Sequence, residues 1–216
     1  MTEILLIRHG ETAWNARKRL QGHLDIPLNA EGEMQAAALG LALMDEPLDA
    51  IISSDLQRAR QTAKAIAAPR GMEVRIDAGL RERCYGAFEG MLYAEIGQRY
   101  PEAYAAWQSR DIDARFPKGV HAAETMREFF QRAVGTITRI ASEGTYRKIA
   151  LVAHGGVLEC AYRAAQGVGF GQARDFDIFN ASINRFTWDG EKLNLMHWGD
   201  VSHLDIERAL DEIDRE

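Results

Sequence analysis

Cysteine, proline and strongly basic segments are scarce in this chain of 216 residues, which has two cysteines and five prolines. Cys84 and Cys160 are too few for a disulfide framework and have no metal-type spacing, so we expect both to be buried as small apolar side chains. Such low cysteine usage is typical of a reducing compartment and predicts a cytoplasmic location. No block of lysines and arginines is present, which argues against a nucleic-acid partner.

Long apolar runs and low-complexity linkers are also missing. No uninterrupted apolar run approaches the ~18 residues of a membrane span, and no secretory signal pattern is visible, so we expect no membrane association. Without repeats or Pro/Gly/Ser linkers, residues 1–216 are predicted to form a single domain. The net charge is −6. An acidic protein can still bind an anionic substrate if a few arginines converge in one pocket.

Short apolar runs alternate with helical patterns along the chain, which predicts an α/β fold with a mostly parallel central sheet between helical layers. The predicted strands cover residues 4–7, 48–52, 74–76 and 149–153, with a hairpin of 184–188 and 192–197 around Asp189-Gly190. One predicted helix begins near Asn29, and a second runs from Ser54 to about Ala67. Two more are predicted over residues 123–142 and 157–166.

Three local features sharpen this prediction. Ser54 with Gln57 has the form of a capping box at the start of a helix. The stripe Met34, Ala37, Ala38, Leu41 has helical spacing and predicts the packed face of the helix after Asn29. The aromatic-rich residues 92–122 break the alternation and predict a helical insertion or lid.

Side chains suited to phosphate chemistry follow four of the predicted strands. Arg8 and His9 follow the first, Arg58 the second, Glu82 the third and His154 the fourth. Because ligands of open α/β sheets bind outside the carboxyl ends of the strands, we expect these residues to meet at one edge.

Each residue type has a chemical role at such an edge. Arg8 and Arg58 match phosphate oxygens in pairs, and a neutral imidazole of His9 can attack phosphorus to form a phosphohistidine. His154 would donate a hydrogen bond to the phosphoryl oxygens, and Glu82 would protonate the leaving oxygen and then activate water. Gly10 and Gly155 allow the backbone to approach an anion closely.

Simpler roles remain open for several residues. His23, His121 and His197 are expected to be structural or exposed, and Glu11 and Glu89 compete with Glu82 for the role of the acid. The aromatic group from Tyr93 to Trp107 is more often packing than substrate contact.

The segment Leu6-Ile7-Arg8-His9-Gly10-Glu11-Thr12 resembles the signature of the histidine phosphatase superfamily, which has the phosphoglycerate-mutase-like fold. Later stretches are similar in order and spacing: Gln21-Gly22, Ser53 to Ala59, Leu80-Arg81-Glu82 and His154-Gly155-Gly156. The resemblance implies a three-layer αβα sandwich, phosphorylation of His9 and no metal or cofactor. The residues it places in the catalytic and substrate-binding site are Arg8, His9, Asn15, Gln21, Gly22, Arg58, Glu82, His154 and Gly155.

Within this family the end of the chain is similar to the branch of broad-specificity and α-ribazole phosphatases, in Asn180-Ala181-Ser182, Trp188 and Gly199-Asp200-Val201-Ser202-His203-Leu204. The chain lacks the arginine- and lysine-rich segment that glycolytic mutases carry after the acidic glutamate. Where the family often has Gly-Glu-Ser before the long helix, this chain has Ala122-Ala123-Glu124-Thr125, so we assign Glu124 no substrate role. We expect a phosphatase of small phosphorylated metabolites, monomeric or homodimeric. The enzymatic alternative is a phosphoglycerate mutase. A phosphate-binding or protein-interaction module that has lost catalysis is less favoured, because the set of site residues is intact.

Overall fold

A six-stranded sheet forms the middle layer of the computed structural model, which describes residues 1–205. Its strand order is β3-β2-β4-β1-β5-β6, with β3, β2, β4 and β1 parallel and β5 and β6 antiparallel. The strands are β1 (Thr2–Arg8), β2 (Ala50–Ser53), β3 (Val74–Ile76), β4 (Lys148–Ala153), β5 (Ile183–Trp188) and β6 (Leu193–Asp200). The predicted mostly parallel sheet with a terminal hairpin is confirmed.

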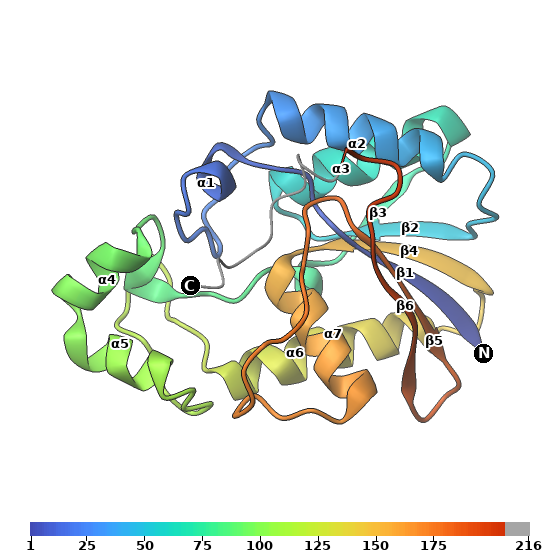
Figure 1. Cartoon of the computed structure of the whole chain (residues 1–216). Coiled ribbons are helices and arrows are strands. Elements are labelled where there is room, and N and C mark those ends of the chain that lie inside the picture. Colours follow the sequence, from blue (N-terminus) through green and yellow to red (C-terminus); the bar gives the residue numbers. More distant parts are fainter. Residues whose placement is uncertain (206–216) are drawn as a thin grey trace.

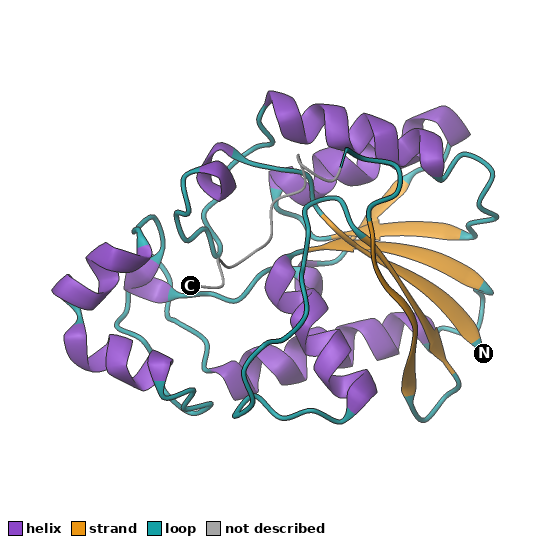
Figure 2. Cartoon of the chain, viewed as in Figure 1, coloured by secondary structure: helices purple, strands orange, loops and turns teal. Residues whose placement is uncertain are grey.

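Helices cover both faces of the sheet (Figures 1 and 2), as the three-layer prediction requires. Helices α2 (Ala30–Ala42) and α3 (Gln57–Ala67) lie on one face, and α6 (Met126–Ala141) and α7 (Gly155–Gln166) lie on the other. The remaining short elements are α1 (Ala13–Ala16) and the 3₁₀ turns Ala68–Arg70, Ala78–Leu80 and Gly86–Phe88.

Strand β1 shows why its sequence is apolar throughout. Leu5 and Ile7 join the cluster that packs against α2 and α3, whereas Ile4 and Leu6 join the cluster under α6 and α7. Successive side chains of a strand point to opposite faces, so a strand covered on both sides needs an unbroken apolar run.

The predicted insertion contains two helices, α4 (Tyr93–Arg99) and α5 (Pro101–Gln108), which lie outside the three layers (Figure 1). It has its own core, in which the rings of Phe88 and Phe116 stack with centroids 4.5 Å apart. All four aromatic residues from Tyr93 to Trp107 pack against this core, as the simpler interpretation expects.

Two local predictions are wrong. Helix α3 begins at Gln57 with Leu56 as its N-cap, and the Gln57 amide donates to the Asp25 carboxylate at 2.6 Å. The Ser54 hydroxyl does not form the predicted capping box and lies 2.9 Å from His154 Nε2. On α2 the predicted stripe faces outward: Met34 and Leu41 are exposed, whereas Leu39 is buried. The alanines and glycines of α2 make several faces equally apolar, so spacing alone selected the wrong one.

Two leucines of α2 test this packing. Replacing the fully buried Leu39 by alanine removes contacts with the sheet and is expected to lower the free energy of unfolding by ~2–5 kcal/mol. Leu41→Ala, on the exposed side of the same helix, should change it by less than ~0.5 kcal/mol. Urea denaturation measures both, and equal losses would contradict the orientation of α2.

Candidate active site

The parallel pairing of β1 with β4 brings two histidines together. Arg8 lies opposite Ala153 in the register, and the His9 amide donates to the Ala153 carbonyl at 3.1 Å. The next residue of each strand is therefore a histidine at the same edge of the sheet. The rings of His9 and His154 lie with centroids 5.1 Å apart.

The His9 imidazole is held in one neutral form. Its Nδ1 lies 2.7 Å from the Gly10 carbonyl, and since a carbonyl only accepts, Nδ1 carries the proton and Nε2 keeps its lone pair. Burial, followed by the positive charges of Arg58 and Arg8, holds the pKa of His9 well below its usual range. A buried imidazole with a free Nε2 lone pair can act as a nucleophile at neutral pH.

Two buried guanidinium groups supply the positive charge. Arg8 Nη1 donates to the Ile178 carbonyl at 2.5 Å, and the two terminal nitrogens of Arg58 donate to the carbonyls of Leu24 and Gly22 at 2.9 and 2.8 Å. Both arginines are almost fully buried. Backbone carbonyls hold both groups in place, and the paired donors and permanent charge of a guanidinium suit it to an anionic ligand.

The second histidine is oriented by a serine. His154 Nε2 lies 2.9 Å from the Ser54 hydroxyl, while Nδ1 has no hydrogen-bond partner within residues 1–205. Burial, and then the charges of Arg58 and His9, lower the pKa of His154 well below its usual range. When the Ser54 hydroxyl donates to Nε2, Nδ1 carries the proton and can donate to a ligand.

Glu82 lies against the start of α7, next to His154. Its Oε2 accepts from the Gly156 amide at 3.0 Å and its Oε1 accepts from the Arg83 amide at 2.7 Å. A Cβ atom on Gly156 would lie 2.3 Å from Glu82 Oε1, so only glycine permits this approach. The His23 ring donates to the Glu82 carbonyl at 2.8 Å and so supports the backbone of this residue.

The two competing glutamates have other partners. Glu11 Oε1 accepts from the Asn29 side chain at 2.6 Å, and Glu89 Oε1 accepts from the amides of His23 and Tyr85 at 2.9 and 3.0 Å. Glu89 thereby braces the loop that carries Gly22, which has a positive φ of 54°. Of these three glutamates, Glu82 is therefore the one whose carboxylate contacts Gly156, two residues after His154.

The remaining predicted residues occupy the loop after β1 and the start of α7. Asn15 and Gln21 are both tied to the Thr12 hydroxyl, at 2.9 and 3.0 Å. Gly22 offers its carbonyl to Arg58, and Gly155 is the first residue of α7, directly after His154. The structure therefore groups the predicted residues at the carboxyl edge of β1, β2 and β4.

Sequence reasoning missed two supporting residues. Ser54 orients His154, although its position before a helix suggested a cap. The Asn180 side chain donates to the His9 carbonyl at 3.0 Å and fixes the backbone of that residue. In the sequence, Asn180-Ala181-Ser182 belongs to the stretch that resembles the phosphatase branch, which gave Asn180 no role of its own. Glu124, which was given no substrate role, pairs with Arg132 at 2.7 Å.

Neither cysteine contributes to this edge. Both are buried, as expected, and burial raises the pKa of the Cys84 thiol to about 11, which disfavours the reactive thiolate. Across residues 1–205, the structure holds no group of three or more His, Cys, Asp and Glu side chains placed for a metal ion. It also contains, within that range, no helix long and apolar enough to cross a membrane.

Comparison with known proteins agrees with this geometry. The family model of the histidine phosphatase superfamily (branch 1) matches residues 4–201. Phosphoglycerate mutase-like protein 4 of Arabidopsis thaliana is 40% identical over 207 residues, covering 94% of this chain and 87% of that protein. The metal-independent phosphoserine phosphatase of the same plant is 37% identical over 210 residues, covering 94% and 84%.

A solved structure matches the fold as a whole. The putative α-ribazole-5'-P phosphatase of Escherichia coli superposes with a TM-score of 0.83 at 27% identity, covering 92% of this chain and 96% of that one. These matches confirm the resemblance expected from the sequence. The chain belongs to the histidine phosphatase superfamily, branch 1.

Proposed function

We propose that this chain is a metal-independent phosphatase that hydrolyses small phosphomonoesters through a phosphohistidine on His9. The proposal is supported above all by the buried, neutral His9 imidazole, whose Nδ1–H donates to the Gly10 carbonyl and which has two buried arginines beside it. The name of the phosphoserine phosphatase relative supports hydrolysis as the outcome.

In the first step, His9 Nε2 attacks phosphorus and the bond from phosphorus to the alkoxy oxygen breaks. Arg8, Arg58 and His154 stabilise the phosphoryl oxygens as charge develops, and the amides at the start of α7 (Gly155) favour the same anion. Glu82, protonated at the start, gives its proton to the departing oxygen. Asn15, Gln21 and Gly22 line the phosphate pocket.

In the second step, water attacks the phosphohistidine while the Glu82 carboxylate accepts its proton. The bond between phosphorus and Nε2 breaks, inorganic phosphate leaves and His9 returns to its neutral form. Throughout both steps the proton stays on Nδ1, which donates to the Gly10 carbonyl, so His9 needs no change of tautomer.

A phosphoglycerate mutase is the second candidate, because the 40% identical relative carries that name. The two reactions share the first step and differ in whether water or a substrate hydroxyl receives the phosphoryl group.

We assign the insertion at residues 92–122 the role of a lid over this site, within one domain of residues 1–216. A cytoplasmic location and a monomeric or homodimeric state stay predictions.

The nucleophile is tested by His9→Ala. Removing the attacking imidazole is expected to lower kcat for p-nitrophenyl phosphate by ~10³-fold or more and to abolish the trapped phosphoenzyme. Phosphate release and mass spectrometry of the quenched enzyme measure these effects. The exposed His197→Ala serves as the matched control and should keep both.

Two outcomes would contradict this assignment: substantial turnover by His9→Ala, or a phosphoryl group on another residue. Conversion of 3-phosphoglycerate to 2-phosphoglycerate without release of phosphate would favour the mutase instead.

The acid is tested by Glu82→Gln with two leaving groups. Protonation matters for glycerol 3-phosphate, whose alkoxide is a poor leaving group, and little for p-nitrophenyl phosphate. We expect the first-turnover rate to fall by ~10²–10⁴-fold on the former and by a much smaller factor on the latter. Rapid-quench kinetics measure both rates. Glu89→Gln is the control and should affect the two substrates alike. If Glu82→Gln slowed both substrates by the same factor, the assignment of Glu82 as the acid would be contradicted.

The electrostatic setting of His9 predicts a pH effect. Because burial and the neighbouring arginines disfavour the imidazolium, His9 should stay neutral as the pH falls through ~6.5, where a solvent-exposed histidine gains its proton. Arg58→Met removes one of these charges, so the pKa of His9 should rise. Nitrogen-15 NMR titration of the imidazoles measures it, with Arg75→Met, whose partner is Glu143, as the control. A His9 pKa that is unchanged in Arg58→Met would contradict the proximity of these groups.

A further inference from the structure

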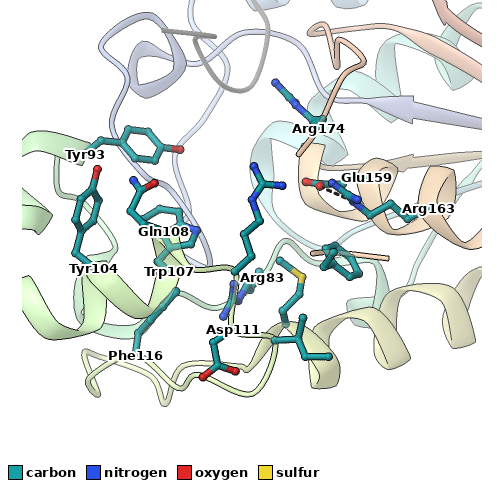
Figure 3. A pocket seen from close by; sticks show the side chains of 14 residues that line it. Arg83, Tyr93, Tyr104, Trp107, Gln108, Asp111, Phe116, Glu159, Arg163 and Arg174 are labelled. Atoms are coloured by element: carbon teal, nitrogen blue, oxygen red, sulfur yellow. Dashed lines mark hydrogen bonds and ion pairs between the residues drawn. The ribbon is translucent and has the colours of Figure 1, made fainter. Parts of the chain in front are cut away.

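The backbone segment that carries Glu82 has no regular secondary structure to hold it. Residues 81–85 lie between the 3₁₀ turns Ala78–Leu80 and Gly86–Phe88 and belong to no helix or strand. Arg83, the next residue, lines a cavity of about 270 Å³ between the insertion and α7 (Figure 3). An irregular segment beside a cavity is packed on fewer sides than a core strand, so its position depends on its hydrogen bonds.

Arg132 of α6 forms hydrogen bonds with the backbone of this segment. Its Nη1 donates to the carbonyls of Gly79 and Arg81 at 3.0 and 2.9 Å, and its Nη2 donates to the Glu82 carbonyl at 3.0 Å. A guanidinium is planar, and its donors have fixed directions. Because these donors bind the carbonyls on both sides of the Arg81–Glu82 peptide, they fix the direction in which the Glu82 side chain leaves the backbone.

Glu124 holds the backbone on the other side of Glu82. Its carboxylate accepts two hydrogen bonds from Arg132, from Nε and from Nη2, both at 2.7 Å. The same carboxylate accepts from the Cys84 amide at 2.9 Å, and the Glu124 amide donates to the Cys84 carbonyl at 2.9 Å. A bidentate ion pair of this kind is more rigid than a single hydrogen bond. Arg132 and Glu124 therefore form one unit that binds the backbone before and after Glu82.

The core of the protein holds Arg132 in turn. Its guanidinium carbon lies 5.1 Å from the centre of the Phe129 ring, which is buried in the core under α6 and α7. A Cβ atom on Gly156 would lie 3.0 Å from the Phe129 ring, so this ring packs against the start of α7. The Gly156 amide donates to the Glu82 carboxylate. Helix α6 thus supports both the backbone of Glu82, through Arg132, and the contact of its carboxylate, through Phe129.

We propose that Arg132 is a positioning residue for the acid: by fixing the backbone from Gly79 to Glu82, it places the Glu82 carboxylate where it can protonate the leaving oxygen. This inference rests on the proposed phosphatase function and adds a residue to it. In this role Arg132 acts through Glu82 and not on the substrate. Proton transfer is sensitive to placement, since a displacement of about 1 Å can cost ~10²-fold in rate.

The dependence on the leaving group separates this role from a general loss of structure. Arg132→Met removes the donors and keeps a long side chain. We expect the first-turnover rate to fall by about 10- to 100-fold on glycerol 3-phosphate and by less than about threefold on p-nitrophenyl phosphate, whose leaving group barely needs a proton. Rapid-quench kinetics measure both rates. Arg127→Met, which removes an ion pair with Asp113 from the same helix, is the matched control and should change both rates by the same factor.

A double variant tests whether Arg132 acts through Glu82. In the Glu82→Gln background, Arg132→Met should leave the ratio of the two rates unchanged, because the acid that it positions is already gone. If the selective losses of the two single variants multiply instead, Arg132 acts independently of Glu82 and the proposal is overturned.

Arg132→Lys separates the hydrogen bonds from the charge. Lysine keeps the positive charge without the planar fork, so it should recover only part of the rate on glycerol 3-phosphate. Full recovery would show that the charge alone matters and would overturn the positioning role.

Failure of this inference and failure of the proposed function give different results. If Glu82→Gln is selective for glycerol 3-phosphate but Arg132→Met slows both substrates equally, the role of Arg132 is overturned alone. If the wild type releases no phosphate from either compound, the proposed function fails, and this inference with it. Should Arg132→Met not fold by circular dichroism, Arg132→Lys decides: a selective loss on glycerol 3-phosphate supports the proposal, and an unchanged ratio of the two rates overturns it.

Discussion

The parallel hydrogen bonding of β1 with β4 is the interaction on which the candidate site depends. It sets Arg8 opposite Ala153, so His9 and His154 follow their strands at the same level although 145 positions separate them in sequence. A shift of one residue in this register would turn the apolar side chains of β1 to the wrong faces. Core packing on both faces therefore also fixes the distance between the two imidazoles.

Buried positive charge is the second constraint. Arg8, Arg58 and Arg83 are withdrawn from water in a protein whose net charge is −6. Backbone carbonyls hold Arg8 and Arg58 in position, and an aromatic ring supports Arg83. Burial and then the charges of Arg58 and Arg8 hold the pKa of His9 well below its usual range, and the same two charges suit the site to an anionic ligand.

The wrong predictions share a physical cause. Ser54 has the residue type and spacing of a helix cap, but its hydroxyl interacts with His154, a residue one hundred positions away. The apolar stripe of α2 was ambiguous because alanine and glycine occupy most of the helix, and only contact with α3 and the sheet selects the face that holds Leu39. Local patterns cannot rank such alternatives when the deciding partner is distant in sequence.

The sequence by itself determined the α/β class, the positions of the strands and the family, because unbroken apolar runs and the Arg8-His9-Gly10 segment are local signals. It also named the candidate phosphate-binding residues. Only the tertiary structure decided that Glu82, and neither Glu11 nor Glu89, contacts the start of α7, and that Ser54 interacts with His154. These properties depend on neighbours brought together by the sheet and the insertion, which residue spacing does not encode.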